Sequence, residues 1–195
     1  NLVLGMYGDD KDFFTLKGVV ENLLDTLAIR EYDVDAKSDD PTFHPGRCAV
    51  LSKDGEEFGI IGEVHPLVCA NYGINTRVYV GKLKLRKLFA MMDTQRSYVP
   101  MPKFPASTRD LALLGDDALP VMTMEKAIKA AAGKILEKIE LFDVYKGSQI
   151  AQGKKSVAFN ISMRASDRTL TDEEVNGAMS KILKALEELG AQIRS

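Results

Sequence analysis

The chain has 195 residues, of which 45% are hydrophobic and 28% charged, and its formal net charge is −2 at pH 7. These values are typical of a globular protein with one large or two small domains, and they exclude a net field strong enough to attract polyanions by itself. No segment approaches the roughly 18 to 20 apolar residues of a membrane span, and the start NLVLGMYGDD lacks a secretory signal. We therefore expect a cytoplasmic protein with unpaired cysteines.

The chain opens at Asn1 in what reads as the middle of a strand, so we expect it to be a piece of a longer polypeptide. Residues 1–96 hold 12 Lys and Arg against 15 Asp and Glu, whereas residues 97–195 hold 14 against 13. Any nucleic-acid contact is therefore expected to be local and to lie in the second half.

The first half reads as a sheet with one helix packed on it. Residues 12–27 carry leucines and valines at helical spacing, with Asp12 as the expected cap. Short apolar runs separated by turn residues predict antiparallel strands. These runs lie near residues 30–35, 47–53, 57–65 and 76–83. We assign residues 1–90 to this first domain.

A proline-containing linker is predicted at residues 91–107. It carries Pro100, Pro102 and Pro105 and shows no sustained helical or strand period. Each proline removes a backbone donor and biases the preceding residue to extended geometry, so a domain boundary is expected here.

The second half, residues 108–195, alternates strands and helices. Its predicted elements are a strand at 108–114, a helix at 123–133, strands at 134–145 and 156–164, a helix at 171–189 and a short strand at 191–194. Thr123 is the expected cap of the first helix, and Thr171 with Glu174 forms a capping box for the second. The order βαββαβ predicts a ferredoxin-like domain, so the whole chain is expected to be an α+β protein.

One face of this second sheet is expected to be free of helices. In residues 156–164 every second side chain is apolar, and burying each large one is worth about 1.5 to 3 kcal/mol, so this set faces the helices. The polar set, which begins at Ser156, then faces outward.

The neighbouring strand contributes an aromatic ring and a carboxylate to the same open face. We expect Phe142 and Val144 to be buried on the helix side, which turns Asp143 and Tyr145 outward. Three lysines border these residues, namely Lys146, Lys154 and Lys155. Such a patch is suited to stacking a base and hydrogen-bonding its edge.

Several linked motifs resemble a known family. KFPASTRDLAL, LFDVYKG and KSVAFNISMRASDRTLTDEEV resemble the anticodon-binding domain at the C-terminus of the beta subunit of bacterial phenylalanyl-tRNA synthetase. DFFTLKGVVENLL, FHPGRCAVL, GIIGEVHPLV and RVYVGKLKLRKL resemble the end of that subunit's synthetase-like module. The match runs along nearly the whole chain in the same order.

The resemblance implies a division of labour. In this family the class II synthetase-like module of the beta subunit is catalytically silent, and the active site lies in the alpha subunit of a heterotetramer of two alpha and two beta chains. ATP and Mg are used by the whole enzyme, and no cofactor or catalytic residue is expected in this chain. The family places Asp143, Tyr145 and Ser156 at the first anticodon base, whereas the three lysines come from the residue pattern alone.

The two histidines and two cysteines raise the question of a zinc site. His44 and Cys48, like His65 and Cys69, are four residues apart, and a proline follows each histidine. Structural zinc sites more often pair Cys with Cys and His with His, so we expect two strand-end turns with incidental buried cysteines and no metal. A cysteine nucleophile would need a base within hydrogen-bond reach and a third orienting group, and the sequence shows neither, so we expect no nucleophilic cysteine.

Two functions are compatible with these features. The preferred one is recognition of the tRNA(Phe) anticodon by residues 108–195, with structural support from residues 1–90. The alternative is a structural or subunit-contact chain with no RNA binding of its own, because ferredoxin-like domains have many functions. The expected partners are tRNA(Phe), the alpha subunit and the rest of the beta subunit.

Overall fold

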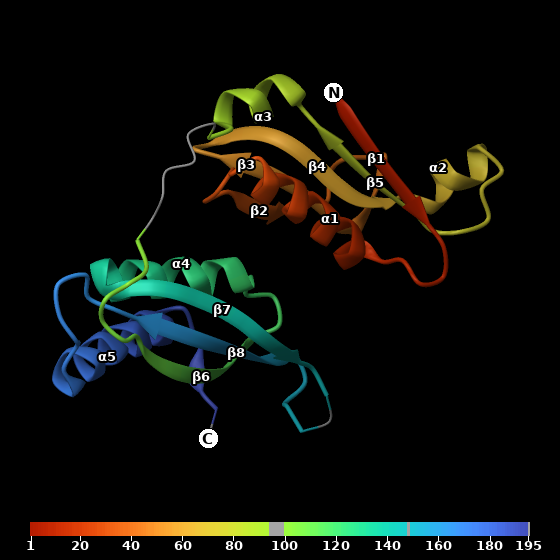
Figure 1. The fold of residues 1–195 in the computed structure, drawn as a ribbon. Coiled ribbons are helices and arrows are strands. Elements are labelled where there is room, and N and C mark those ends of the chain that lie inside the picture. The colour runs from red at the N-terminus through yellow and green to blue at the C-terminus, as the bar shows by residue number, and fades with distance from the viewer. Residues whose placement is uncertain (94–99, 148, 195) are drawn as a thin grey trace. The chain divides into compact units, whose positions relative to one another are not determined.

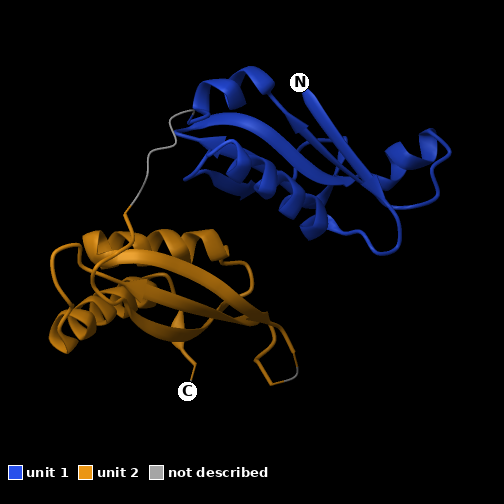
Figure 2. Ribbon diagram, in the orientation of Figure 1, with its two compact units in different colours: residues 1–98 blue, residues 99–195 orange. Residues whose placement is uncertain are grey.

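The computed structural model describes residues 1–93, 100–147 and 149–194, which fold into two compact units, residues 1–98 and 99–195 (Figure 2). Of the predicted linker at 91–107, residues 94–99 lie outside the described part of the chain. Within the described ranges, no helix has the length and apolar character needed to cross a membrane. Both units combine helices with antiparallel strands, in agreement with the predicted α+β class.

Unit 1 is a five-stranded antiparallel sheet in the order β1-β5-β4-β3-β2 (Figure 1). The strands are β1 (Leu2–Tyr7), β2 (Asp33–Ala36), β3 (Phe43–Lys53), β4 (Glu56–Val64) and β5 (Val78–Leu83). Helix α1 (Phe13–Thr26) packs on one face of the sheet through Leu16, Val20 and Leu24, each at most 1% exposed. Its start is fixed by Asp12, whose carboxylate accepts a hydrogen bond from Thr15 N at 2.7 Å, as predicted from the sequence.

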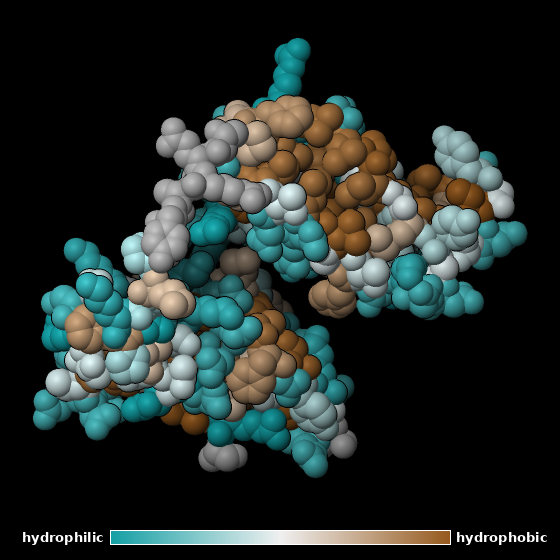
Figure 3. All heavy atoms as spheres, viewed as in Figure 1, coloured by the Kyte–Doolittle hydropathy of each residue, from teal (hydrophilic) through white to brown (hydrophobic). Residues whose placement is uncertain are grey.

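Two short helices of unit 1 are additions to the elements predicted from the sequence: α2 (Pro66–Asn71) and α3 (Leu85–Met91). The sheet face opposite α1 carries apolar side chains. Gly81 faces α1, since a Cβ there would lie 3.7 Å from Val20, so its neighbour Val80 points to the opposite face. Hydrophobic residues gather on the surface of this unit between α3 and β1 (Figure 3), and Val3 and Tyr7 are 62% and 73% exposed.

Unit 2 has the strand order β7-β8-β6-β9 and contains β6 (Ser107–Asp116), β7 (Leu136–Tyr145), β8 (Lys154–Met163) and β9 (Gln192–Ile193). Helices α4 (Val121–Ala132) and α5 (Asp172–Glu188) cover one face of this sheet (Figure 1). This is the predicted ferredoxin-like arrangement. The core between helices and sheet includes Phe159, Ile161, Met124 and Ile182, all fully buried.

The helix boundaries of unit 2 follow local signals with one exception. Helix α4 begins at Val121, with Pro120 at the N-cap position and no side-chain capping hydrogen bond, so the predicted cap at Thr123 is wrong: Thr123 lies within the first turn and donates its N–H to the Pro120 carbonyl at 3.1 Å. The predicted stop at Gly133 is correct: its φ of 62° suits a residue without Cβ. A single 3₁₀ turn, η1 (Gly133–Ile135), then leads into β7, as expected for a short helical extension.

Candidate nucleic-acid interface

Strand pairing brings the three predicted base-contacting residues together. In the β7–β8 register Tyr145 lies directly opposite Ser156, and Asp143 lies opposite Ala158. Directly opposed residues share a face of the sheet. Val157, which is fully buried, faces the helices, so its neighbours Ser156 and Ala158 belong to the helix-free face. We call this helix-free surface of unit 2 the open face.

The opposite edge of the open face is formed by β6 and the end of the chain. Ser156 pairs with Leu114 and Ala158 with Ala112 across β6. Arg194, just after β9, donates its backbone N–H to the carbonyl of Ala112 at 2.9 Å. Ala112 and Ala158 therefore form a part of the open face with small side chains, between Asp143 of β7 and Arg194 after β9.

Arg194 contacts residues of both β7 and β8. Its Nη1 donates a hydrogen bond to Ser156 Oγ at 3.2 Å, and its Cζ lies 6.0 Å from the centroid of the Tyr145 ring, within cation–π range. Ser156 is only 4% exposed. The sequence does not predict a role for Arg194. Alternation in AQIR could have assigned its side chain to one face of the sheet, but its distance to Ser156 depends on how β9 pairs with β6.

Asp143 and Tyr145 differ in how far their side chains are exposed and in the contacts that they make. The Asp143 side chain is exposed, and its carboxylate has no hydrogen-bond or ion-pair partner within the part of the chain that the structure describes. The Tyr145 ring is half-buried and lies against Gly147, where an added Cβ would approach the phenol oxygen to 2.3 Å. The cluster therefore offers a free acceptor beside an aromatic ring that lies close to Gly147.

Lys146 and Lys154 form ion pairs with the end of β6 and the turn that follows it. Lys146 pairs with Asp117, and this hydrogen bond holds the pKa of the Asp117 carboxyl below its usual value. Lys154 Nζ lies 3.8 Å from Asp116. Both lysine side chains are more than 40% exposed, so these pairs are weak and solvent-screened.

The structure places Lys155 away from the open face. Its partner in β6 is Gly115, where an added Cβ would meet Met124 of α4 at 2.8 Å, so this row faces the helices. Lys155 is 7% exposed, and its Nζ donates to the Asp117 carbonyl at 2.9 Å. Burial lowers its pKa, followed by smaller effects of nearby charges. Lys155 therefore stabilises the turn between β6 and α4.

The expected burial of Phe142 and Val144 is wrong. Val144 pairs with Val157 and so lies on the helix side, but it is 42% exposed because β7 is an edge strand. Phe142 is 58% exposed. A register shift between Leu141 and Asp143 interrupts the alternation on which the prediction depended.

The far end of the open face is occupied by polar contacts of its own. Asn160 donates to Asp110 at 2.7 Å, and Arg164 donates to Glu137 at 2.9 Å and also to the Phe104 carbonyl. These groups are already partnered, so the half of the face around Tyr145 is the one available to a ligand.

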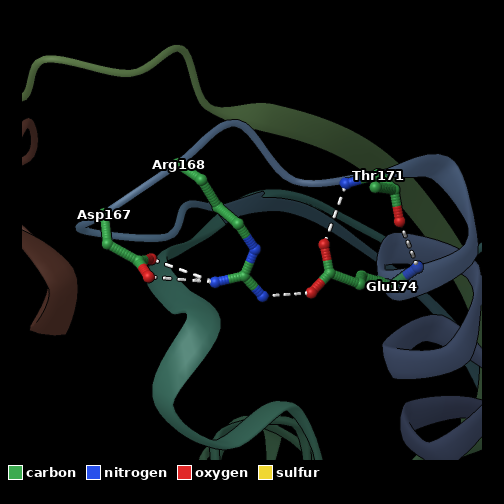
Figure 4. Close-up of polar contacts among 4 residues, drawn as sticks. All are labelled: Asp167, Arg168, Thr171 and Glu174. Carbon is green, nitrogen blue, oxygen red and sulfur yellow. Dashed lines mark hydrogen bonds and ion pairs between the residues drawn. The ribbon is translucent and has the colours of Figure 1, made fainter.

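The β8–α5 loop is tied to the start of α5. Thr171 Oγ accepts from Glu174 N at 3.3 Å, while Glu174 accepts from Thr171 N at 3.0 Å, which is the predicted capping box (Figure 4). Arg168 bridges Glu174 and Asp167, and Figure 4 shows its guanidinium between the two carboxylates. The hydrogen bond from Thr171 N, and then that from Arg168, lower the pKa of Glu174.

The His and Cys residues take up local structural roles. His44 Nδ1 accepts from Gly46 N at 3.1 Å, within an irregular stretch of β3, and His65 Nδ1 accepts from Leu67 N at 3.2 Å as the cap of α2. Cys48 is buried, which raises its thiol pKa to about 11. Among residues 1–93, 100–147 and 149–194, no cluster of three or more His, Cys, Asp or Glu side chains is arranged to hold a metal.

Residues 102–194 match the family model of the ferredoxin-fold anticodon binding domain. The class of unit 2 is thereby defined as a ferredoxin-fold domain of the anticodon-binding kind. Residues 1–85 match the model of the phenylalanyl tRNA synthetase beta chain CLM domain. Together the matches cover most of the chain, in the order predicted from its motifs.

Curated relatives agree with both matches. The phenylalanine–tRNA ligase beta subunit of Clostridium tetani is 48% identical over 194 residues, and that of Clostridium acetobutylicum is 44% identical over the same length. Each alignment covers 99% of this chain and 24% of the relative. The beta subunit of Bacillus subtilis is 42% identical over 177 residues, which is 91% of this chain and 22% of the relative. The chain belongs to the phenylalanyl-tRNA synthetase beta chain family and spans about a quarter of the length of these relatives.

Proposed function

We propose that unit 2 reads the anticodon of tRNA(Phe), within a phenylalanine–tRNA ligase. The observation that carries this proposal is the cluster of Asp143, Tyr145, Ser156 and Arg194 on the open face, inside a domain of the anticodon-binding family. An aromatic ring beside hydrogen-bonding groups is the usual arrangement for holding an unpaired base.

Each side chain has a distinct task in this proposal. The Tyr145 ring stacks on the first anticodon base, a contact worth about 1 to 3 kcal/mol. A carboxylate only accepts hydrogen bonds, so Asp143 favours a base edge that presents N–H donors. Ser156 can both donate and accept, and it fixes the position of the base between the strands.

Access to Ser156 requires Arg194 to move. With Ser156 only 4% exposed and its Oγ hydrogen-bonded to Arg194, a base reaches that oxygen after the guanidinium swings aside. The guanidinium can then stack on the base or pair with a backbone phosphate, both of which suit arginine. Lys146 and Lys154 add exposed positive charge near the end of β6.

The experiment is a titration of the full chain with a labelled RNA hairpin that carries the tRNA(Phe) anticodon loop. We expect Tyr145→Ala to weaken binding by about 5- to 150-fold and Tyr145→Phe, which keeps the ring, to weaken it far less. The affinity should fall with rising salt, by about 0.7 log units per log unit of salt for each phosphate contact. Unchanged affinity in both Tyr145→Ala and Asp143→Ala would remove these residues from the interface.

We propose that unit 1 acts as a non-catalytic structural module, with the alpha subunit and the rest of the beta subunit as its contacts. Its α1-free sheet face presents Val3, Tyr7 and Val80, an apolar surface suited to another polypeptide. ATP and Mg then act elsewhere in the enzyme, in a cytoplasmic setting. An ATP–pyrophosphate exchange assay on this chain with phenylalanine should give no signal, and exchange above background would reject this assignment.

A further inference from the structure

Phe142 is an exposed aromatic residue at an irregularity of an edge strand. Leu141 lies opposite Phe159, and Asp143 lies opposite Ala158, the very next residue of β8, so Phe142 is an extra residue with no partner of its own. This is a β-bulge, a feature that redirects side chains at sheet edges.

Alternation along β7 directs Phe142 toward the open face. Leu141 opposes Phe159 of the core and therefore points to the helix side, so alternation directs the next side chain to the other face. Asp143, after the bulge, again lies on the open face opposite Ala158. Two consecutive side chains, Phe142 and Asp143, thus share the face that carries Tyr145.

The exposure of this ring has a free-energy cost that burial would avoid. Phe142 is 58% exposed, whereas Phe159 on the adjacent strand is fully buried. Counted from Leu141, alternation puts Phe142 on the open face, and the extra residue then puts Asp143 there as well. A large apolar ring therefore lies in solvent, beside a free carboxylate, rather than in the core.

We propose that Phe142 is a second stacking surface, which holds a nucleotide adjacent to the one held by Tyr145. The two rings are three positions apart in the strand, about 10 Å of extended backbone, so one base does not cover both. The open face would then engage two neighbouring unpaired nucleotides of the anticodon loop. This inference rests on the proposed function and goes beyond it by assigning a further residue and a second nucleotide.

The test pairs protein variants with RNA variants. The full chain, Phe142→Ala and Tyr145→Ala are each titrated with the anticodon hairpin and with hairpins in which one loop nucleotide at a time is abasic. Phe142→Ala should weaken binding of the intact hairpin by about 5- to 150-fold, and this loss should vanish for one abasic hairpin. The abasic position that cancels the Tyr145→Ala loss should be its neighbour in the loop.

Val144→Ala is the matched control, since Val144 is a 42% exposed apolar residue of the same strand that points to the helix side. It should bind the hairpin as the unaltered chain does. Thermal unfolding of each variant separates loss of contact from loss of structure.

The outcomes distinguish this inference from the function on which it rests. If Tyr145→Ala weakens binding while Phe142→Ala and Val144→Ala do not, the second stacking site is wrong and the anticodon function stands. If Phe142→Ala and Val144→Ala weaken binding equally, or if both rings depend on the same nucleotide, the proposed second nucleotide is also wrong. If the unaltered chain does not bind the hairpin, both proposals fail, and an apolar edge for a protein partner becomes the better explanation of Phe142.

Discussion

Replacing Gly147 by alanine should move the Tyr145 ring without harming the fold. An added Cβ would lie 2.3 Å from the Tyr145 phenol oxygen and 2.5 Å from its Cζ, against an ordinary contact of at least 3.4 Å. The ring must therefore move by about 1 Å. Because the phenol is the free end of a side chain, it can yield, and we expect its stacking position to be lost instead of the domain unfolding.

The expected effects on stability and binding have different signs. Gly147 has no positive φ, so alanine adds no backbone strain, and restricting the unfolded chain contributes about 0.4 to 1 kcal/mol of stability, which the displacement of the Tyr145 ring offsets in part. Affinity for the anticodon hairpin should fall, with the loss in Tyr145→Ala, about 5- to 150-fold, as its upper bound. Urea unfolding and hairpin titration measure the two quantities.

Gly177→Ala is the control for this substitution. Gly177 lies on the exposed side of α5 with no atom within 4 Å of an added Cβ, so alanine should stabilise the helix by about 0.5 to 1 kcal/mol and leave binding unchanged. Full hairpin affinity in Gly147→Ala would show that the position of the Tyr145 ring does not matter, and would refute the reasoning.

Three further variants probe the surroundings of the site. Thr171→Ala should lower the free energy of unfolding by about 1 kcal/mol through loss of the capping box, as read from urea unfolding, with no change in hairpin binding. Lys155→Ala should destabilise the β6–α4 turn in the same assay, whereas Lys154→Ala should leave stability nearly unchanged and reduce the salt slope of binding. Burial raises the Cys48 pKa to about 11, so its stabilising effect should be complete below pH 9 and decline as the pH rises toward 11; unfolding of Cys48→Ala should lack this decline.

The parts of the fold that depend on local chemistry could be predicted from the sequence. Asp12 with Thr15, and Thr171 with Glu174, are capping pairs three residues apart, and both start helices in the structure. Gly133 ends α4 because its backbone takes a positive φ. The predicted start of α4 is wrong because Thr123 and Pro120 are competing signals within a few residues.

The parts that depend on how strands pair could not be predicted from the sequence. A bulge changes which side chain faces which side, and nothing in LFDVYKG marks the extra residue, so the sequence alone predicts Phe142 in the core. Charge alone groups Lys155 with its neighbours, although it occupies a helix-side position of β8. Arg194 is distant in sequence from Ser156 and meets it only because β9 pairs with β6.

The central claim, that the open face of unit 2 reads the first anticodon base, is tested most directly by base exchange at that position. The full chain and Asp143→Ala are each titrated with four hairpins that differ only in the first anticodon base. We expect the unaltered chain to prefer the native base by about 1 to 3 kcal/mol over at least one other base, and Asp143→Ala to lose most of that preference. Equal affinity for all four hairpins, or the same preference in both proteins, would contradict the account.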